Sequence, residues 1–354
     1  APAPAKPDVI PAPAADLPRT GTSAVPAEPA PAAPQATEPA PAKTPAAPAP
    51  APPPVKHVWV VALTGHSLDE VAADPAVMPY LTGTLQPKGM TLHNWEAASA
   101  GSLANLVVLT SARKPTAEQT QGCPTYADTN CVLPKAVDTL PGQLQAAGKT
   151  WRGYVESSDV GSDPPNGCRH PELGQPDPWT APRPGDAYLT QRNPFVYYHS
   201  IVDTPDCGAN LAGMARLAPD AQDAESAPNY SLVVPDACHD GRDAPCADGA
   251  AAGLGAADAW LKEQLDPLLA SKAYADDGLV VVTFDAGPDP LKPVGALLLS
   301  PHVAPGTKGD TPYTHTGLVR TIEDAFSLEH LGKADSDSVK ALGDDVFSIT
   351  TPSR

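Results

Sequence analysis

The first 54 residues lack every aromatic side chain and almost every large apolar one. By count, 18 of them are proline and 18 are alanine. Such a segment buries too little apolar surface to offset the entropy that a chain loses on ordering. Proline-rich runs are also extended and stiff. We therefore expect residues 1–56 to form a disordered tether, and residues 57–354 to form one folded domain.

The sequence also lacks a run of about 20 apolar residues, so we expect no membrane-spanning helix. A basic cluster is missing as well. The chain has 23 Lys and Arg against 41 Asp and Glu, which gives a formal net charge of −18. An acidic protein repels the phosphates of nucleic acids and anionic membrane surfaces at long range. Nucleic acid is therefore not an expected partner.

CxxC spacing is absent too, although the sequence holds six cysteines. Their number is even, and two pairs lie eight residues apart in polar loop sequence. In an exported chain this pattern predicts disulfide bonds, although six cysteines can pair in many ways. A Cys-based metal site is the alternative. The pairs that we expect are Cys123–Cys131, Cys238–Cys246 and, from the two that remain, Cys168–Cys207.

The chain begins at Ala1 rather than Met, and alternating Ala and Pro follow. A mature exported protein begins in this way after cleavage behind small residues. We therefore expect a secreted or cell-envelope protein outside the cytoplasm, whose Pro/Ala arm tethers it to the envelope.

Short apolar runs alternate with helical patterns over the rest of the chain. Nearly continuous apolar runs are typical of strands buried on both faces of a parallel sheet. The runs are 57–63, 230–234, 279–284 and 294–299, with a weaker one at 150–155. The helical patterns are 103–112, 136–147, 256–271 and 315–328. A loop-rich stretch at 157–228 lies between the second and the third.

Ser102 and Asp138 are candidate N-terminal caps of the first two helices. Strands that alternate with helices predict an α/β fold, in which a mostly parallel central sheet carries helices on both faces.

Polar side chains follow three of the predicted strands at their carboxyl ends. In open parallel sheets, ligands bind at this edge. The three polar groups are residues 64–67, 235–243 and 285–289. One such group is ordinary loop polarity, whereas three at one edge indicate a binding site.

Seven segments between His57 and Leu331 carry a further signal. In order they read HVWVVALTGHSLDE, GSLANLVVLTSA, LPGQLQAAGKTWRGYVES, QRNPFVYYHSI, VVPDACHDGRD, GLVVVTFDAG and YTHTGLVRTIEDAFSLEHLG. In content and order they resemble the segments of the bacterial phosphoesterase family, which contains acid phosphatases and phospholipases C. This family is a branch of the alkaline-phosphatase-like superfamily, so the resemblance implies that fold.

The resemblance also implies a mechanism. In the family, a hydroxyl at a helix start attacks phosphorus, a covalent phospho-enzyme forms, and water releases phosphate. Metal ions at the strand ends stabilise the developing charge and activate the nucleophile. Ser102 matches the nucleophile, and a helix N-terminus at this position would point free N–H groups at a bound anion. A simple helix cap is the alternative for Ser102.

Further residues match the family's motifs. Asn105, one helical turn after the serine, is placed to reach a phosphate oxygen and is a candidate substrate-binding residue. Asp240, Asp285 and His315 match metal-binding positions, and Asp243 matches the second aspartate of the same motif as Asp240. A hydrogen-bonded loop histidine is the alternative for His315. The resemblance implies a divalent metal, and the sequence does not distinguish Zn²⁺, Ca²⁺ and Mg²⁺ from one another, or from no metal at all.

The departures from the family cluster at the metal. Thr64 and Gly65 stand where the family has Glu and Asn, and Ala286 replaces an acidic residue. Arg242 and His239 replace a His and an Asn. Arginine only donates hydrogen bonds and cannot ligate a metal, but its guanidinium binds phosphate through two N–H groups. We therefore expect an incomplete metal site, with Arg242 as a substrate-binding residue.

Two functions remain open. The first is an exported hydrolase of phosphoric esters that uses Ser102 as nucleophile with metal assistance. The second is a catalytically inactive relative that binds an anionic ligand in the cell envelope. A purely structural envelope protein is a third, and the polar strand ends argue against it. The first two require Ser102, Asp240, Asp285 and His315 to line one polar hollow.

Overall fold

The computed structural model describes residues 53–162, 165–242, 246 and 249–347. The chain divides into two units, Ala1–Ala49 and Pro50–Arg354, and every described residue belongs to the second. The tether predicted for residues 1–56 lies almost wholly outside the described residues, so its boundary at residue 56 stays a prediction. Asp243 also lies outside the described residues.

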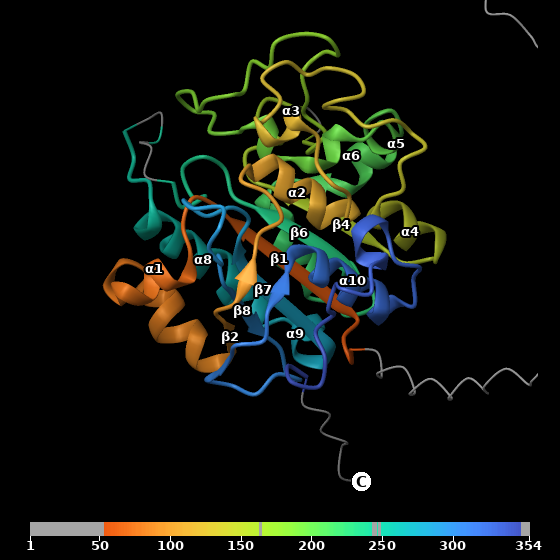
Figure 1. Cartoon of the computed structure of the whole chain (residues 1–354). Coiled ribbons are helices and arrows are strands. Elements are labelled where there is room, and N and C mark those ends of the chain that lie inside the picture. Colours follow the sequence, from red (N-terminus) through yellow and green to blue (C-terminus); the bar gives the residue numbers. More distant parts are fainter. Residues whose placement is uncertain (1–52, 163–164, 243–245, 247–248, 348–354) are drawn as a thin grey trace, which may run out of the picture. The chain divides into compact units, whose positions relative to one another are not determined.

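An eight-stranded sheet forms the centre of the second unit (Figure 1). Its order is β5-β4-β6-β1-β7-β8-β2-β9, and the first five strands in this order run parallel. Strands β3 (Trp95–Glu96) and β10 (Tyr313–Thr314) form a separate parallel pair. The strands of the main sheet are β1 (His57–Leu63), β2 (Met90–Leu92), β4 (Trp151–Val155), β5 (Leu211–Ala212), β6 (Tyr230–Val234), β7 (Gly278–Phe284), β8 (Ala296–Leu299) and β9 (Thr307–Gly309).

The central strands are buried along their whole length. Every residue of β1 and β7 is buried, and Trp59 of β1 pairs with Val280 of β7 in parallel register. Fully burying one such apolar side chain contributes about 1.5–3 kcal/mol, which explains why uninterrupted apolar runs become the middle of the sheet. The predicted strands are confirmed as strands of one mostly parallel sheet.

The last predicted strand has an unexpected direction. β8 runs antiparallel to both β7 and β2. Only residues 285–295 connect β7 to β8. A parallel return needs a crossover of about a dozen residues or more, usually through a helix, and this connection contains none.

Helices cover both faces of the sheet, as predicted. α2, α4 and α10 contact one another in one layer, and α7, α8 and α9 contact one another in the other (Figure 1). The α-helices are α1 (Leu68–Ala73), α2 (Ser102–Ser111), α3 (Ala117–Thr120), α4 (Leu140–Ala146), α5 (His199–Val202), α6 (Asp206–Asn210), α7 (Leu217–Ala221), α8 (Leu254–Leu269), α9 (Lys272–Asp277) and α10 (His315–Phe326). Short 3-10 or π turns are η1 (Pro75–Val77), η2 (Leu81–Leu85), η3 (Gln86–Lys88), η4 (Thr190–Arg192), η5 (Pro194–Tyr197), η6 (Met214–Arg216) and η7 (Gly332–Asp335).

Two predicted helix caps are wrong. Thr139, not Asp138, caps α4, because its Oγ1 accepts the backbone N–H of Gly142 at 3.1 Å. The N-cap of α2 is Gly101, and Ser102 is the first helical residue. A Cβ at Gly101 would collide with the carbonyl oxygen of Thr120, so only glycine fits there. Ser102 therefore does not cap its helix, and its hydroxyl is available for other contacts.

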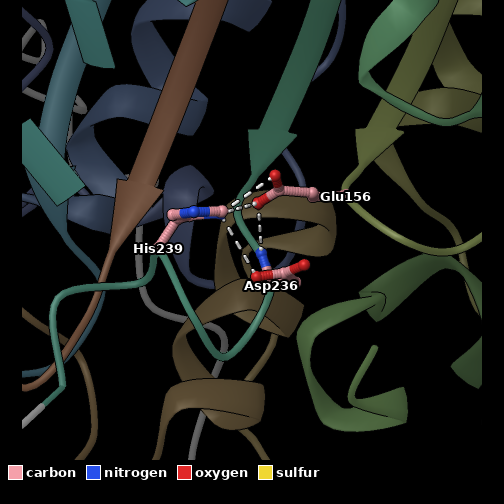
Figure 2. Close-up of side chains that lie close together, drawn as sticks. All are labelled: Glu156, Asp236 and His239. Atoms are coloured by element: carbon pink, nitrogen blue, oxygen red, sulfur yellow. Dashed lines mark hydrogen bonds and ion pairs between the residues drawn. The ribbon is translucent and has the colours of Figure 1, made fainter. Parts of the chain in front are cut away.

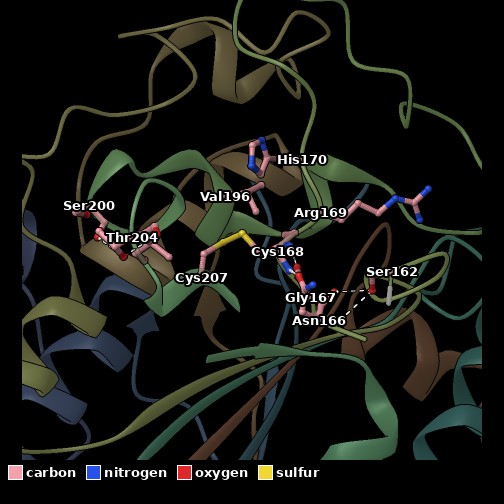
Figure 3. The surroundings of a disulfide bond; sticks show 12 residues. Ser162, Asn166, Gly167, Cys168, Arg169, His170, Val196, Ser200, Thr204 and Cys207 are labelled. Carbon is pink, nitrogen blue, oxygen red and sulfur yellow. Dashed lines mark hydrogen bonds between the residues drawn. A yellow bond between two sulfur atoms is a disulfide. The ribbon is translucent and has the colours of Figure 1, made fainter. Parts of the chain in front are cut away.

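Three disulfide bonds have the predicted pairing: Cys123–Cys131, Cys168–Cys207 and Cys238–Cys246. Figure 3 shows how Cys168 and Cys207 join two parts of the loop-rich stretch 157–228, which also carries β5 and several short helices. Because all six cysteines are paired, the alternative of a Cys-based metal site is wrong. Three disulfides indicate an oxidising, extracytoplasmic compartment. Within the described part of the chain, no helix has the length and apolar character needed to cross a membrane.

Candidate active site

Four neighbouring strands end in polar residues at one edge of the sheet. Glu156 directly follows β4, Thr64 follows β1, and Asp285 follows β7, while Asp236 comes two residues after β6. These strands lie side by side in the order β4-β6-β1-β7. Because adjacent strands are about 4.8 Å apart, the four ends span about 15 Å. The edge can therefore hold one substrate-sized site.

At this edge, Ser102 lies between the carboxylate of Asp285 and the guanidinium of Arg192. Its Oγ donates a hydrogen bond to Oδ2 of Asp285 at 2.8 Å. Nη1 of Arg192, the last residue of η4, donates to the same Oγ at 2.7 Å and also forms an ion pair with Oδ2 of Asp285. The hydroxyl is thus positioned to lose a proton on one side and to be stabilised by positive charge on the other.

Arg192 and Asp285 form a fully buried ion pair. Both side chains are 0% exposed. Nη2 of Arg192 also donates to the carbonyl oxygen of Ala62 in β1 at 2.6 Å, which fixes the guanidinium against the sheet. Nε of Arg192 and Oδ1 of Asp285 are buried without a hydrogen-bond partner among the described residues. The pair therefore keeps one free donor and one free acceptor.

The ring of His315 contacts the backbone carbonyl of Asp285. The pairing of β3 with β10 brings Trp95 beside His315, and Nε1 of Trp95 donates to Nδ1 of His315 at 2.9 Å. Because an indole N–H only donates, Nδ1 must accept, and Nε2–H donates to the carbonyl oxygen of Asp285 at 3.0 Å. Burial also lowers the pKa of His315, which favours this neutral ring. The predicted role of His315 as a metal ligand would require one of the two bonds to break.

Asp240 forms a second ion pair at this edge, with Arg242. The backbone N–H of Arg242 donates to Oδ1 of Asp240 at 3.0 Å, and its Nε and Nη2 donate to Oδ2 at 2.9 and 2.6 Å. Asp240 is fully buried, whereas the side chain of Arg242 is 34% exposed. The backbone N–H of Thr64 donates to the carbonyl oxygen of Asp240 at 2.8 Å, so this pair adjoins the end of β1.

Gly65 makes room for this second pair. Its φ is +83°, a conformation that favours glycine, and a Cβ there would lie 3.0 Å from Cγ of Arg242. The glycine that replaces the family's asparagine and the arginine that replaces its histidine therefore fit each other. This relation between Gly65 and Arg242 could not be read from their separate positions in the sequence.

Asn105 holds the loop before α2. Its Oδ1 accepts the N–H groups of Ala98 and Ser99 at 2.8 and 2.9 Å. Its Nδ2 donates to the carbonyl oxygens of Ser99 and Gly101 at 2.6 and 3.0 Å. Asn105 is fully buried, so in this arrangement it positions the loop that presents Ser102. Its predicted contact with substrate stays a prediction.

Glu156, Asp236 and His239 form a second polar cluster, at the ends of β4 and β6 (Figure 2). Nδ1 of His239 lies 3.0 Å from Oε1 of Glu156 and 3.4 Å from Oδ1 of Asp236. Hydrogen bonds that the ring donates to these two carboxylates raise the pKa of His239 to about 10. Burial raises the pKa of Glu156, whereas bonds to His239 and Ser157 outweigh burial and lower the pKa of Asp236. One ligand atom from each residue could contact a common metal ion.

The metal ligands implied by the family do not fit around Ser102. Thr64, Gly65 and Ala286 offer no anionic oxygen. The carboxylates of Asp285 and Asp240 are each occupied by a guanidinium. A metal ion at Ser102 would have to displace a buried arginine, so we derive no chemical step through an ion there.

Sequence reasoning missed Arg192, although it lies in the family-like segment QRNPFVYYHSI, because nothing in that segment shows that the arginine reaches Ser102. Glu156 lay in a quoted segment and follows a predicted strand, which is the signal that could have singled it out. The structure brings Ser102 and His315 each into contact with Asp285, and Asp240 adjoins the next strand end.

The model of the phosphoesterase family matches residues 73–289, more than half of the chain. The chain belongs to the phosphoesterase family. The curated "Probable acid phosphatase" of Kluyveromyces lactis is 26% identical over 253 residues, which cover 69% of this chain and 56% of that protein. The chain thus spans between about a third and three fifths of the length of the curated relatives that it matches.

The fold of this phosphoesterase is shared with a solved structure. A candidate sulfatase from Bacteroides thetaiotaomicron has a TM-score of 0.50 at 11% identity, covering 82% of this chain and 74% of that one. A protein in the alkaline phosphatase superfamily from Vibrio parahaemolyticus has a TM-score of 0.47 at 11% identity, covering 79% and 68%. The predicted family and α/β fold class are confirmed. Family membership suggests hydrolysis of phosphoric esters and the use of a metal.

Proposed function

We propose that this protein hydrolyses phosphoric esters with Ser102 as the nucleophile. The observation that carries the proposal is the position of its hydroxyl, held between the carboxylate of Asp285 and the guanidinium of Arg192. Membership of the phosphoesterase family and similarity to a protein named as an acid phosphatase support the reaction class.

The reaction follows from these contacts. Oγ of Ser102 attacks the phosphorus atom while its proton passes to Oδ2 of Asp285, 2.8 Å away. The bond between phosphorus and the alcohol oxygen breaks, and the departing alcohol takes up that proton. Water then breaks the bond between Oγ and phosphorus, which releases inorganic phosphate and returns a proton to Ser102.

The start of α2 favours binding of the phosphoryl group. The backbone N–H groups of a helix's first turn have no partner inside the helix, and the helix dipole is positive there. The N-cap of α2 is Gly101, and no side chain accepts a hydrogen bond from the N–H groups of the first turn as a cap. An anion bound beside Ser102 would meet these N–H groups.

Hydrolysis of p-nitrophenyl phosphate tests this proposal. Ser102→Ala should lower kcat by about 1,000-fold or more, because the covalent step then has no nucleophile. Ser338→Ala, which changes an exposed serine, should leave the rate unchanged. A wild-type protein no faster than Ser102→Ala would refute the hydrolase.

A second function is favoured by one observation. Arg242 neutralises the buried Asp240 and still exposes a third of its side chain, which suits anion binding without catalysis. In this second proposal the protein is an inactive family member that binds an anionic ligand in the cell envelope. Phosphate should then raise the melting temperature, and Arg242→Ala should abolish the shift, while Ser102→Ala and wild type are equally inactive.

We also propose that a metal ion, if one binds, is held by Glu156, Asp236 and His239. Ligands about 2.1 Å from a tetrahedral ion lie about 3.4 Å apart, close to the 3.0 and 3.4 Å that separate Nδ1 of His239 from the two carboxylates. Ser157 donates to Oδ2 of Asp236 at 2.7 Å and would orient this ligand. Such an ion would tie the end of β4 to the end of β6. One imidazole and two carboxylates suit Zn²⁺ better than Ca²⁺ or Mg²⁺.

Zinc titration of chelator-treated protein tests this site. One equivalent should bind and raise the melting temperature, and His239→Ala should lose both effects. His199→Ala is the matched control, because His199 contacts two exposed carboxylates on the surface. Equal zinc binding by wild type and His239→Ala would refute the site.

Export to the cell envelope is a further part of the proposal. The three disulfides support an extracytoplasmic location, and residues 1–56 would serve as the tether. Cell fractionation of the full chain and of a chain without residues 1–56 tests it. Release of the shortened chain alone would support tethering, and identical distributions would contradict it.

A further inference from the structure

We infer that the guanidinium groups of Arg192 and Arg242 take the place of metal ions as the positive charges at the phosphoryl site. The site would then bind and transfer a phosphoryl group without a divalent ion at Ser102. The catalytic part of this inference rests on the proposed hydrolase function, whereas the binding part does not.

The first argument is charge compensation. Asp285 and Asp240 are the two carboxylates that the family's motif assigns to metal, and both side chains are 0% exposed. A buried carboxylate needs a cationic partner. Each already has one, and each partner adds further bonds: Arg192 to Ala62, and Arg242 through its own backbone N–H. Neither of these two carboxylates therefore keeps an uncompensated charge for a divalent ion.

The second argument is space. Arg242 packs over Gly65, where a longer side chain would meet its Cγ and would adopt a φ of +83°. An asparagine at residue 65 would therefore crowd Arg242 and adopt a backbone conformation that favours glycine. Gly65 and Arg242, two of the departures from the family's motifs, are thus compatible with each other.

The third argument is chemical function. A metal ion in such a site would polarise the serine hydroxyl and stabilise the charge that develops on its oxygen. Nη1 of Arg192 already donates to Oγ of Ser102 at 2.7 Å. Oδ2 of Asp285 already accepts a hydrogen bond from the Ser102 hydroxyl. A buried guanidinium held in place before the reaction stabilises the developing alkoxide without reorganisation. Arg192 is therefore a catalytic residue in this arrangement.

The fourth argument is the unused hydrogen-bonding capacity. Nε of Arg192 and Oδ1 of Asp285 are both fully buried and have no partner among the described residues. Arg242 uses Nε and Nη2 for Asp240, its Nη1 makes no hydrogen bond to another described residue, and its side chain is 34% exposed. Donors that are left free beside a nucleophile are suited to a phosphate ester, which offers several acceptor oxygens.

Binding of inorganic phosphate to chelator-treated protein is the first test. Phosphate in the presence of EDTA should raise the melting temperature of wild type, and Arg242→Ala should remove most of that shift. Arg216→Ala, which changes an exposed arginine paired only with Asp220, should keep it. A phosphate shift that appears only after a divalent ion is added would overturn the inference, whether or not the protein is an enzyme.

Kinetics with p-nitrophenyl phosphate is the second test. EDTA should leave the wild-type rate unchanged, and Arg192→Lys should lower kcat by about 100-fold, with a smaller change in KM, because the lost interaction acts on the reacting oxygen. Arg192→Ala should regain part of its rate when guanidinium ions are added. Circular dichroism of each variant separates loss of the fold from loss of the contact.

The two proposals fail differently. If wild type and Ser102→Ala are equally inactive but metal-free protein still binds phosphate through Arg242, the hydrolase proposal fails and the charge replacement stands. If hydrolysis depends on Ser102 but disappears with EDTA and returns with a divalent ion, the hydrolase stands and the charge replacement fails.

Discussion

At the scale of single residues, Glu323 is a buried acid that forms no ion pair with another described residue. It lies in α10, its Oε1 accepts the N–H of Leu331 at 2.9 Å, and its Oε2 has no partner among the described residues. Burial raises the pKa of Glu323 to about 8. Since the unfolded chain has an ordinary glutamate pKa, the folded state holds this proton over a pH range in which the unfolded state has lost it.

The free energy of unfolding should therefore decrease as pH rises from about 4.5 to about 8, because the folded state binds more protons in this range. Glu323→Gln should remove this slope, since an amide does not titrate. Chemical denaturation of both proteins at several pH values measures the difference. A parallel pH dependence of the two proteins would contradict the assignment, and Glu118→Gln, on the exposed surface of α3, serves as the control.

At the scale of elements, the start of α2 depends on the loop that precedes it. Asn105 reaches back from the helix and makes four hydrogen bonds to the backbone of residues 98–101. This loop and the glycine N-cap set the position of the first helical residue, Ser102. The position of the proposed nucleophile is therefore a property of the loop and the helix together.

Asn105→Ala should destabilise the protein by about 2–4 kcal/mol, because it leaves buried backbone groups without partners. It should also lower kcat more than it changes KM, because Ser102 loses its fixed position. Urea unfolding and p-nitrophenyl phosphate kinetics measure the two effects. Asn130→Ala, whose amide contacts only the exposed Glu118, should change stability by less than about 0.5 kcal/mol. Equal effects of both variants would contradict the role of Asn105.

At the scale of the whole molecule, the three disulfides stabilise the domain unequally. Cys168–Cys207 spans 39 residues, whereas each of the other bonds spans eight. A cross-link that closes a longer loop removes more entropy from the unfolded chain. Cys168–Cys207 also joins two parts of the stretch 157–228, whose helices and strand are short. Short elements contribute little stability of their own, so the cross-link should matter more there.

Replacing Cys168 and Cys207 together by serine should cost about 4 kcal/mol, and replacing Cys123 and Cys131 together about 3 kcal/mol. Denaturant unfolding of the two double variants compares these losses. An equal or reversed order would show that strain or local packing, rather than loop length, decides the contribution of each bond.

The sequence predicted much of this molecule because many of its signals are local. Apolar runs such as 57–63 must be buried, so they become strands, and helices between them make the sheet mostly parallel. The pairs of cysteines eight residues apart and the GSLAN segment of Ser102 are also local patterns. For β8, the direction depended on the short connection from β7, which the apolar run itself does not encode.

The sequence by itself determined the α/β fold, the disulfide pairs, the family and Ser102 as candidate nucleophile, because burial patterns and motifs are properties of neighbouring residues. Only the tertiary structure placed Arg192 against Ser102 and Asp285, which lie 90 and 93 residues away along the chain. It also showed that Gly65 and Arg242 fit each other. A buried charge is stable only with its partner, and which residues become partners depends on how distant segments pack, not on the residues beside them.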